Sequence, residues 1–329
     1  MRTTKRDIVK LLVPDTKDLS QQTARSYAPS NIALIKYWGK RCPELLLPVT
    51  SSLSICLPCG THTQVSASSK DEFFLAGTRL TNEHVFSKRM SLYLDLFRTP
   101  FCPYFRIETS NDLPTSAGLA TSASGFCCLI LALNELFGWN LSKRKLSILA
   151  RLGSGSACRS IDTGFVEWHK GTSSDGLDSF AEKFPYSFSD LQVGILPIST
   201  EQKPIDSRLA MKITQETSPL YQAWPKVVEN DLFSLKKAII EKNFIDFGTI
   251  LEHNSQTMHA TMISSLPSIL YWKKETVDAM HRIWQLRKDN CFVFFSMDAG
   301  PNMKLFFQKK DQNICLREFP NLHILTPTF

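Results

Sequence analysis

One segment indicates the architecture more clearly than any other: Asn111-Asp112-Leu113-Pro114-Thr115-Ser116-Ala117-Gly118-Leu119-Ala120-Thr121-Ser122-Ala123-Ser124-Gly125. Small and hydroxyl side chains fill it, between the strand-like run YFRIETS and a very apolar helix predicted over residues 119–137. Backbone N–H groups in such a turn can approach an anion closely, and the helix N-terminus adds favourable dipole charge. The segment is neither a Walker loop nor a dinucleotide-binding G-x-G-x-x-G. We interpret it as a phosphate-binding turn; the alternative is a small-residue helix packed tightly on a sheet.

The segments on either side predict a mixed protein of two lobes. Strand-like runs and a helix over residues 85–98 precede the turn, and the helix that follows it is expected to end at Gly138. Ser142 is expected to cap a helix over residues 143–151. From residue 190 a strand leads into helical patterns over residues 219–241, 244–260 and 274–288, and then into two strands, CFVFFSM and MKLFF. This order predicts an α+β fold, with lobes at residues 25–190 and 191–329 after a loosely packed extension of residues 1–24.

Bulk composition excludes several classes of protein. The 329 residues are 43% hydrophobic and 21% charged, as in an ordinary globular protein, and no run approaches the roughly 18 apolar residues of a membrane helix. Nine cysteines without the spacing of a metal site or a disulfide framework predict reduced, mostly buried thiols, no metal bound by protein ligands, and a cytoplasmic location. The formal charge of +7 comes from scattered basic pairs, so we expect neither a nucleic-acid nor a membrane partner.

A second cluster of small and hydroxyl residues is Leu152-Gly153-Ser154-Gly155-Ser156-Ala157-Cys158-Arg159-Ser160. Hydroxyl and amide groups suit an oxyanion, and an arginine can bind a carboxylate or a phosphate through two parallel hydrogen bonds. The alternative is a serine-rich turn whose arginine faces solvent. Two such segments in one half of the chain favour a polyanionic ligand.

Two further segments carry charged residues at the ends of apolar strands. Lys36 follows four strand residues in Asn31-Ile32-Ala33-Leu34-Ile35-Lys36-Tyr37-Trp38-Gly39-Lys40, and Asp298 follows the strand of residues 292–297 in Asp298-Ala299-Gly300-Pro301-Asn302. Taken alone, the two lysines could lie on a strand with their side chains in solvent. Taken alone, the aspartate could serve only to form a turn. A carboxylate held in a cleft could instead orient or deprotonate a hydroxyl group.

Taken in this order, NIALIKYWGK, the turn of residues 114–125, GSGSACRS and DAGPN resemble the diphosphomevalonate decarboxylases of the GHMP kinase superfamily. Further matching pieces are Gly164-Phe165-Val166-Glu167-Trp168, Glu216-Thr217-Ser218-Pro219-Leu220 and Ser255-Gln256-Thr257-Met258-His259. The resemblance extends from about residue 26 to residue 308.

The resemblance implies the GHMP kinase fold, with a ribosomal-protein-like N-terminal lobe, a ferredoxin-like C-terminal lobe, and ATP and substrate in the cleft between them. It implies an ATP- and Mg²⁺-dependent enzyme of the mevalonate pathway that phosphorylates the C3 hydroxyl of mevalonate 5-diphosphate. Decarboxylation then gives isopentenyl diphosphate, CO2, ADP and phosphate. A homodimer is expected.

The resemblance also implies roles for single residues. Asp298 would orient or deprotonate the C3 hydroxyl, Arg159 would grip the substrate carboxylate, and Lys36 would neutralise phosphoryl charge. Binding of the ATP phosphates with Mg²⁺ is assigned to Asn111, Pro114, Ser116, Ala117, Gly118, Leu119, Ala120, Thr121 and Ser122. Binding of the substrate, including its 5-diphosphate, is assigned to Tyr37, Lys40, Ser154, Gly155, Ser156 and Arg159.

Three positions depart from the family pattern and keep alternatives open. Cys42 stands where an acidic residue is usual, Leu46-Leu47 lacks the usual asparagine before Pro48, and Glu72 lies on a strand that often carries a basic residue. A decarboxylase or kinase acting on mevalonate or mevalonate 5-phosphate is therefore an alternative. A non-catalytic RNA-binding protein is another, suggested by the +7 charge and the ribosomal-protein-like lobe. His253 and His259, six residues apart on a predicted helix, would face different sides, which favours packed or hydrogen-bonded roles over a metal pair.

Overall fold

The computed structural model describes residues 3–15, 18–112, 121–201, 203 and 205–329. Its N-terminal lobe is built on two long antiparallel strands, β1 (Thr23–Ile35) and β4 (Ser52–Ala67). The other strands extend this sheet in the order β6-β5-β7-β4-β8-β9. Their bounds are β5 (Glu72–Leu75), β6 (Thr78–Leu80), β7 (Phe105–Asn111), β8 (Phe165–Trp168) and β9 (Ala181–Lys183). A small hairpin, β2 (Lys40–Cys42) with β3 (Leu47–Pro48), follows the end of β1.

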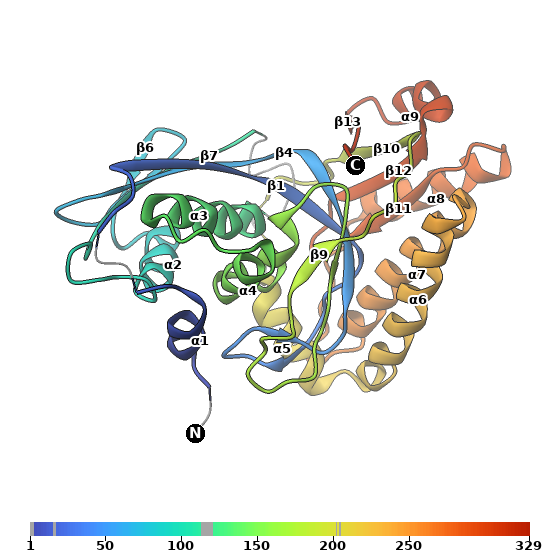
Figure 1. Cartoon of the computed structure of the whole chain (residues 1–329). Coiled ribbons are helices and arrows are strands. Elements are labelled where there is room, and N and C mark those ends of the chain that lie inside the picture. The colour runs from blue at the N-terminus through green and yellow to red at the C-terminus, as the bar shows by residue number, and fades with distance from the viewer. Residues whose placement is uncertain (1–2, 16–17, 113–120, 202, 204) are drawn as a thin grey trace.

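Three helices cover one face of this sheet: α2 (Val85–Leu94), α3 (Thr121–Phe137) and α4 (Lys143–Gly153) (Figure 1). Helix α3 ends as predicted, because Gly138 adopts a φ of 66°, a left-handed conformation that favours glycine. Ser142 caps α4 as predicted, since its side chain accepts a hydrogen bond from the Lys145 N–H. Helix α2 ends at Leu94, four residues earlier than expected.

The C-terminal lobe is an antiparallel sheet with helices packed against it. The sheet order is β11-β12-β10-β13. Its strands are β10 (Leu191–Leu196), β11 (Phe294–Met297), β12 (Met303–Gln308) and β13 (His323–Leu325). Its helices are α5 (Ser207–Thr217), α6 (Trp224–Ile240), α7 (Phe244–Ile263), α8 (Lys274–Lys288) and α9 (Gln312–Glu318). The predicted α+β architecture of two lobes is thus confirmed (Figure 1).

One hydrophobic cluster extends across both lobes, which fixes how they face each other. Ile32, Leu34 and Ile35 of β1 are buried in the same cluster as Trp224 of α6 and Phe247 of α7. Because strand β1 reaches from the N-terminal sheet to the helices of the other lobe, its C-terminal end lies where the lobes meet.

Some elements differ from the sequence-based expectation. The expected helix of residues 219–241 is divided into a 3-10 turn, Pro219–Gln222, and α6, which begins at Trp224. The first 24 residues are not loosely packed throughout, because α1 (Lys5–Leu12) buries Ile8 and Val9 in the N-terminal core. Helices α5 and α9 were not predicted. None of the described helices combines the length and the apolar character needed to cross a lipid bilayer.

Candidate functional site

A cleft of about 490 Å³ lies between the lobes and is lined by residues from both. It brings together nine of the residues predicted for the site: Lys36, Tyr37, Lys40, Ser122, Ser154, Gly155, Ser156, Arg159 and Asp298. These residues come from the segment just after β1, the start of β2, the start of α3, the 3-10 helix η2 (Gly155–Ile161) with the residue before it, and the turn after β11. Segments more than 250 residues apart in sequence therefore form one site.

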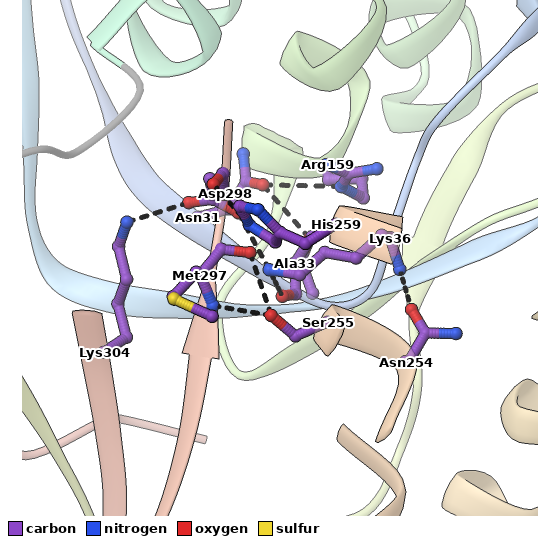
Figure 2. A network of polar contacts seen from close by, with 11 residues as sticks. Asn31, Ala33, Lys36, Arg159, Asn254, Ser255, His259, Met297, Asp298 and Lys304 are labelled. Carbon is purple, nitrogen blue, oxygen red and sulfur yellow. Dashed lines mark hydrogen bonds and ion pairs between the residues drawn. The ribbon is translucent and has the colours of Figure 1, made fainter. Parts of the chain in front are cut away.

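Asp298 is held between two lysines. The Lys36 ammonium lies 2.9 Å from Oδ1 of Asp298, and the Lys304 ammonium lies 3.0 Å from Oδ2 (Figure 2). Both lysine side chains are only 2% exposed, whereas the carboxylate side chain is 34% exposed. The carboxylate is thus the most exposed member of this trio.

The lysines determine the ionisation of this carboxylate. Burial alone raises the pKa of Asp298, but the positive charges of Lys304 and Lys36 outweigh it and hold the pKa well below its usual range. Burial lowers the pKa of Lys36, and its ion pair with Asp298 opposes that change. Asp298 is therefore an anion across the physiological pH range and a weak proton acceptor.

The backbone of Lys36 is fixed by a side chain rather than by a neighbouring strand, because regular pairing of β1 stops just before it. The register of β1 against β4 shifts between Ala33 and Ile35, and the Lys36 backbone N–H donates to Oδ1 of Asn254 at 2.8 Å. Asn254 is itself held by Asp231, which accepts from its amide at 2.8 Å. The Lys36 ammonium also donates to the Ala33 carbonyl at 2.9 Å. The ammonium is therefore directed at Asp298 from a rigid strand end.

Arg159 is held by polar groups of the N-terminal lobe. One guanidinium N–H donates to Oγ of Ser52 at 2.7 Å, and Nε donates to Oδ1 of Asn31 at 3.4 Å. Asn31 is positioned by its amide, which donates to Oγ of Ser160 at 2.8 Å. Burial lowers the pKa of Arg159, and the charge of Asp298 opposes that change. These contacts leave guanidinium hydrogens available to a ligand, since a guanidinium carries five.

The turn that carries Asp298 is supported from helix α7. Ser255 brackets Met297, accepting from its backbone N–H at 2.8 Å and donating to its carbonyl at 3.1 Å. His259 Nε2 lies 3.1 Å from the backbone carbonyl of Asp298. Burial lowers the pKa of His259 to about 3, with a further contribution from the charge of Lys36. The imidazole is therefore neutral and donates its Nε2–H to that carbonyl, as expected for a hydrogen-bonded histidine rather than a metal ligand.

The far end of the cleft is positively charged. Lys40, Arg89 and Arg208 line it, with Asp206 as the nearby acid. Burial lowers the pKa of Lys40, and the Arg208 charge lowers it further. Gly155 meets Tyr37 so closely that a Cβ there would lie 2.8 Å from the phenol oxygen. The serine- and glycine-rich segment thus forms the wall of a cationic pocket.

The departures from the family pattern lie at different distances from this pocket. Leu46 lines the cleft, whereas neither Cys42 nor Glu72 is among its lining residues. Glu72 instead pairs with Arg79 at 2.9 Å at the edge of the N-terminal sheet. An acidic residue at position 72 therefore does not oppose an anion in this cleft.

The predicted nucleotide side is described only in part. Ser122 lines both the main cleft and an adjoining pocket of about 280 Å³, which Asn111 and Phe126 also line. Asn111 accepts a hydrogen bond from Thr61 at 2.7 Å. Pro114, Ser116, Ala117, Gly118, Leu119 and Ala120 lie outside the described residues, and Thr121 begins helix α3.

Sequence reasoning missed several residues of this site. Lys304 carried a usable signal, because a lysine inside the apolar strand MKLFFQ breaks its pattern and so indicates a partnered buried charge. Arg89 and Arg208 lie on helix surfaces where sequence alone does not separate them from solvated basic residues. Ser52 gave no signal, since serines are frequent on half-buried strands.

Family models match both halves of the chain. Residues 28–181 match the model of the diphosphomevalonate decarboxylase-like N-terminal domain, and residues 193–325 match that of the mevalonate 5-diphosphate decarboxylase C-terminal domain. Among curated proteins, the diphosphomevalonate decarboxylase mvd1 of Aspergillus fumigatus is 35% identical, over 91% of this chain and 80% of its own length.

Solved structures are similar over nearly the whole chain. The mevalonate diphosphate decarboxylase of Staphylococcus aureus superposes with a TM-score of 0.88 at 35% identity, covering 93% of this chain and 96% of that one. A complex described as MDDEF with MVAPP, AMPPCP and magnesium gives a TM-score of 0.85 at 37% identity, covering 93% and 99%. The match confirms the expected GHMP kinase fold.

Proposed function

This chain belongs to the diphosphomevalonate decarboxylase family, and from that premise we propose how its cleft carries out the reaction. The enzyme transfers the γ-phosphoryl group of ATP to the C3 hydroxyl of mevalonate 5-diphosphate. The new phosphate then leaves C3 with its electron pair while the carboxylate leaves as CO2, and the electrons of the broken C–C bond form the double bond of isopentenyl diphosphate. ADP and phosphate are the other products.

The observation that supports this most strongly is the pairing of Asp298 with buried lysines opposite a buried arginine. Asp298 and Lys36 come from the turn after β11 and the end of β1, and Arg159 comes from η2 in the N-terminal lobe. A kinase needs a group that orients the acceptor hydroxyl; a decarboxylase also needs a cation that holds the carboxylate in line with the leaving phosphate.

Asp298 accepts a hydrogen bond from the C3 hydroxyl and orients its oxygen toward the γ-phosphorus. Because its pKa is well below the usual range, it does not remove the proton in advance. The proton passes to Asp298 late, as the new O–P bond forms and makes the C3 oxygen acidic. The Lys36 ammonium, which contacts Asp298, stabilises the negative charge on the transferred phosphoryl group next to that carboxylate.

Arg159 binds the substrate carboxylate through the guanidinium hydrogens that Ser52 and Asn31 do not use. Its position on the rigid η2 segment fixes the C–C bond that breaks. When CO2 departs, the guanidinium loses its anionic partner, so its charge does not favour this step and its contribution is to align the C–C bond with the leaving phosphate.

ATP occupies the region between Ser122, Asn111 and the apolar pocket beside them, with its phosphates at the start of α3. Mg²⁺ would reach this chain as an ion carried by the nucleotide phosphates, because Mg²⁺ is commonly bound through substrate phosphates and only one or two protein oxygens. Ser122 supplies a hydroxyl oxygen of the type Mg²⁺ accepts. When bound, Mg²⁺ offsets phosphate charge.

The cations at the far end favour a 5-diphosphate over a 5-phosphate. Lys40 and Arg208 exceed what one phosphate group requires, and Ser154 and Ser156 add hydroxyl donors to the same cleft. Arg89 lines both this cleft and the adjoining pocket assigned to ATP. We also propose that the chain divides near residue 190 into its two lobes, acts in the cytoplasm and forms a homodimer. Eight buried free thiols fit a reducing compartment; they are Cys56, Cys59, Cys102, Cys127, Cys128, Cys158, Cys291 and Cys315.

The test compares ADP release with mevalonate, its 5-phosphate and its 5-diphosphate, for the wild type and for Asp298→Asn. We expect turnover with the 5-diphosphate and a loss of about 10²–10⁴-fold in kcat in the variant, the range of a positioned acid–base group. Substrate binding, measured by calorimetry, stays within about threefold. Preferred turnover of the 5-phosphate, or a loss below tenfold, contradicts the assignment.

A further inference from the structure

Lys304 is a fully buried lysine that the reaction above does not use. It lies on β12, 2% exposed, with its ammonium 3.0 Å from Oδ2 of Asp298 (Figure 2). It is absent from the residues that line the cleft, whereas Asp298 and Lys36 are among them. We propose that Lys304 is a positioning residue: it holds the far oxygen of Asp298 so that the near oxygen receives the C3 hydroxyl. This inference rests on the proposed function.

The two lysines are not equivalent in this arrangement. Lys36 reaches Oδ1 from the cleft side and can turn to the transferred phosphoryl group, leaving Oδ1 to the substrate hydroxyl. Lys304 reaches Oδ2 from within the C-terminal sheet and has no ligand to turn to. Figure 2 shows Lys304 and Arg159 on opposite sides of Asp298. Lys304 therefore keeps the carboxylate oriented and ionised while Lys36 changes partner.

Five charged or titratable groups in the described part of the chain surround Asp298. Lys36 faces it from the end of β1, Lys304 from β12, Arg159 from η2, and the neutral His259 from α7. Lys203, on the segment before α5, contributes a fifth interaction. When Lys36 turns to phosphate, Lys304 is the remaining direct ion pair of the carboxylate among the described residues. Without it, Asp298 would become both more easily protonated and freer to rotate.

A purely structural role for the ion pair is the competing explanation. In that case a neutral residue at position 304 would lower stability but leave turnover at 25 °C unchanged. A lysine that acts through Asp298 makes a different prediction, since its removal changes turnover and pH dependence without changing substrate binding.

The experiment measures kcat, KM and the pH profile of Lys304→Met in the assay with mevalonate 5-diphosphate. We expect kcat to fall about 10- to 100-fold, the value of a charge-assisted hydrogen bond, with KM within threefold. Because the charge of Lys304 lowers the pKa of Asp298, its removal raises that pKa, and the pH below which kcat/KM falls moves upward. Arg287→Met is the control: it breaks the Arg287–Glu252 ion pair of 2.8 Å in the same lobe and leaves the profile unchanged.

A double-mutant cycle separates the two explanations. If Lys304 acts through Asp298, adding Lys304→Met to the Asp298→Asn variant changes kcat by less than twofold. If Lys304 acts independently, the double variant loses kcat by the product of the two single-variant factors. Lys304→Gln replaces the methionine variant if that variant does not fold. If the wild type is active and the folded variant has a kcat within threefold of it, Lys304 does not have this role. If the wild type is inactive, the proposed function is wrong.

Discussion

His259 provides a quantitative test of the buried network beneath the active-site turn. Its ring is 1% exposed and its Nε2–H donates to the Asp298 carbonyl at 3.1 Å. His259→Gln keeps an N–H donor but cannot titrate. The ring also lies against Trp272, with centroids 5.3 Å apart, so the substitution changes packing by the same amount at every pH.

The expected effect follows from the two pKa values of this histidine. Burial lowers the folded pKa to about 3, whereas the ordinary value is 6.5. As pH falls below 6.5 the unfolded chain takes up a proton that the folded chain refuses, so stability is present above 6.5 and is lost on acidification. At about 1.4 kcal/mol per pH unit below the unfolded pKa, the loss between pH 7 and pH 5 is about 2 kcal/mol.

The assay is urea unfolding of the wild type and of His259→Gln at pH 7 and pH 5. The free energy of unfolding of the wild type should fall by about 2 kcal/mol more than that of the variant over this interval. ¹⁵N chemical shifts of the ring should show a neutral imidazole with hydrogen on Nε2 down to pH 5. Equal pH dependence in the two proteins, or a ring that titrates near pH 6.5, would refute the reasoning.

Three further substitutions test single contacts of the cleft, and a fourth, at Gly125, is a control. Arg159→Lys keeps the charge but not the paired N–H geometry, so kcat/KM should fall at least tenfold in steady-state assays, and full activity would contradict a carboxylate grip. Ser52→Ala removes one support of Arg159 and should lower kcat/KM about 3- to 10-fold, the value of one hydrogen bond; an unchanged value would show that the guanidinium holds its place without it. Gly155→Ala would place a Cβ 2.8 Å from the Tyr37 oxygen and should weaken 5-diphosphate binding in calorimetry, whereas Gly125→Ala meets no atom within 4 Å, apart from the helix backbone around it, and should leave the melting temperature equal or higher.

Much of the fold could be predicted because its signals are local. Helix α4 is marked by Ser142 as its cap, and α3 by a long apolar run that ends at Gly138. Helix α5 was missed because the preceding Asp206 cap is followed by a mixed run, SRLAMKITQET, whose burial depends on the other lobe. Helix α1 was missed because its apolar residues, Ile8 and Val9, are few and gain burial only against the N-terminal core.

The site was predictable where chemistry lies in a contiguous motif. Asp298, Arg159 and Lys36 each lie in a recognisable segment, so all three could be proposed from the sequence, and the structure places them in one cleft. The partners that fix them come from elsewhere: Lys304 from the next strand, Ser52 from β4 and Asn254 from α7. Sequence alone does not show which strands pair in space, so these supporting contacts could not be assigned before the structure.

One cleft both phosphorylates the substrate and breaks its C–C bond. This coupling is measured by following ADP and CO2 together during turnover of mevalonate 5-diphosphate carrying ¹⁴C in its carboxylate. We expect equal amounts of ADP and labelled CO2 at every time point after the first turnover. Sustained ADP formation without CO2, with a phosphorylated six-carbon product accumulating, would show a kinase and contradict this expectation.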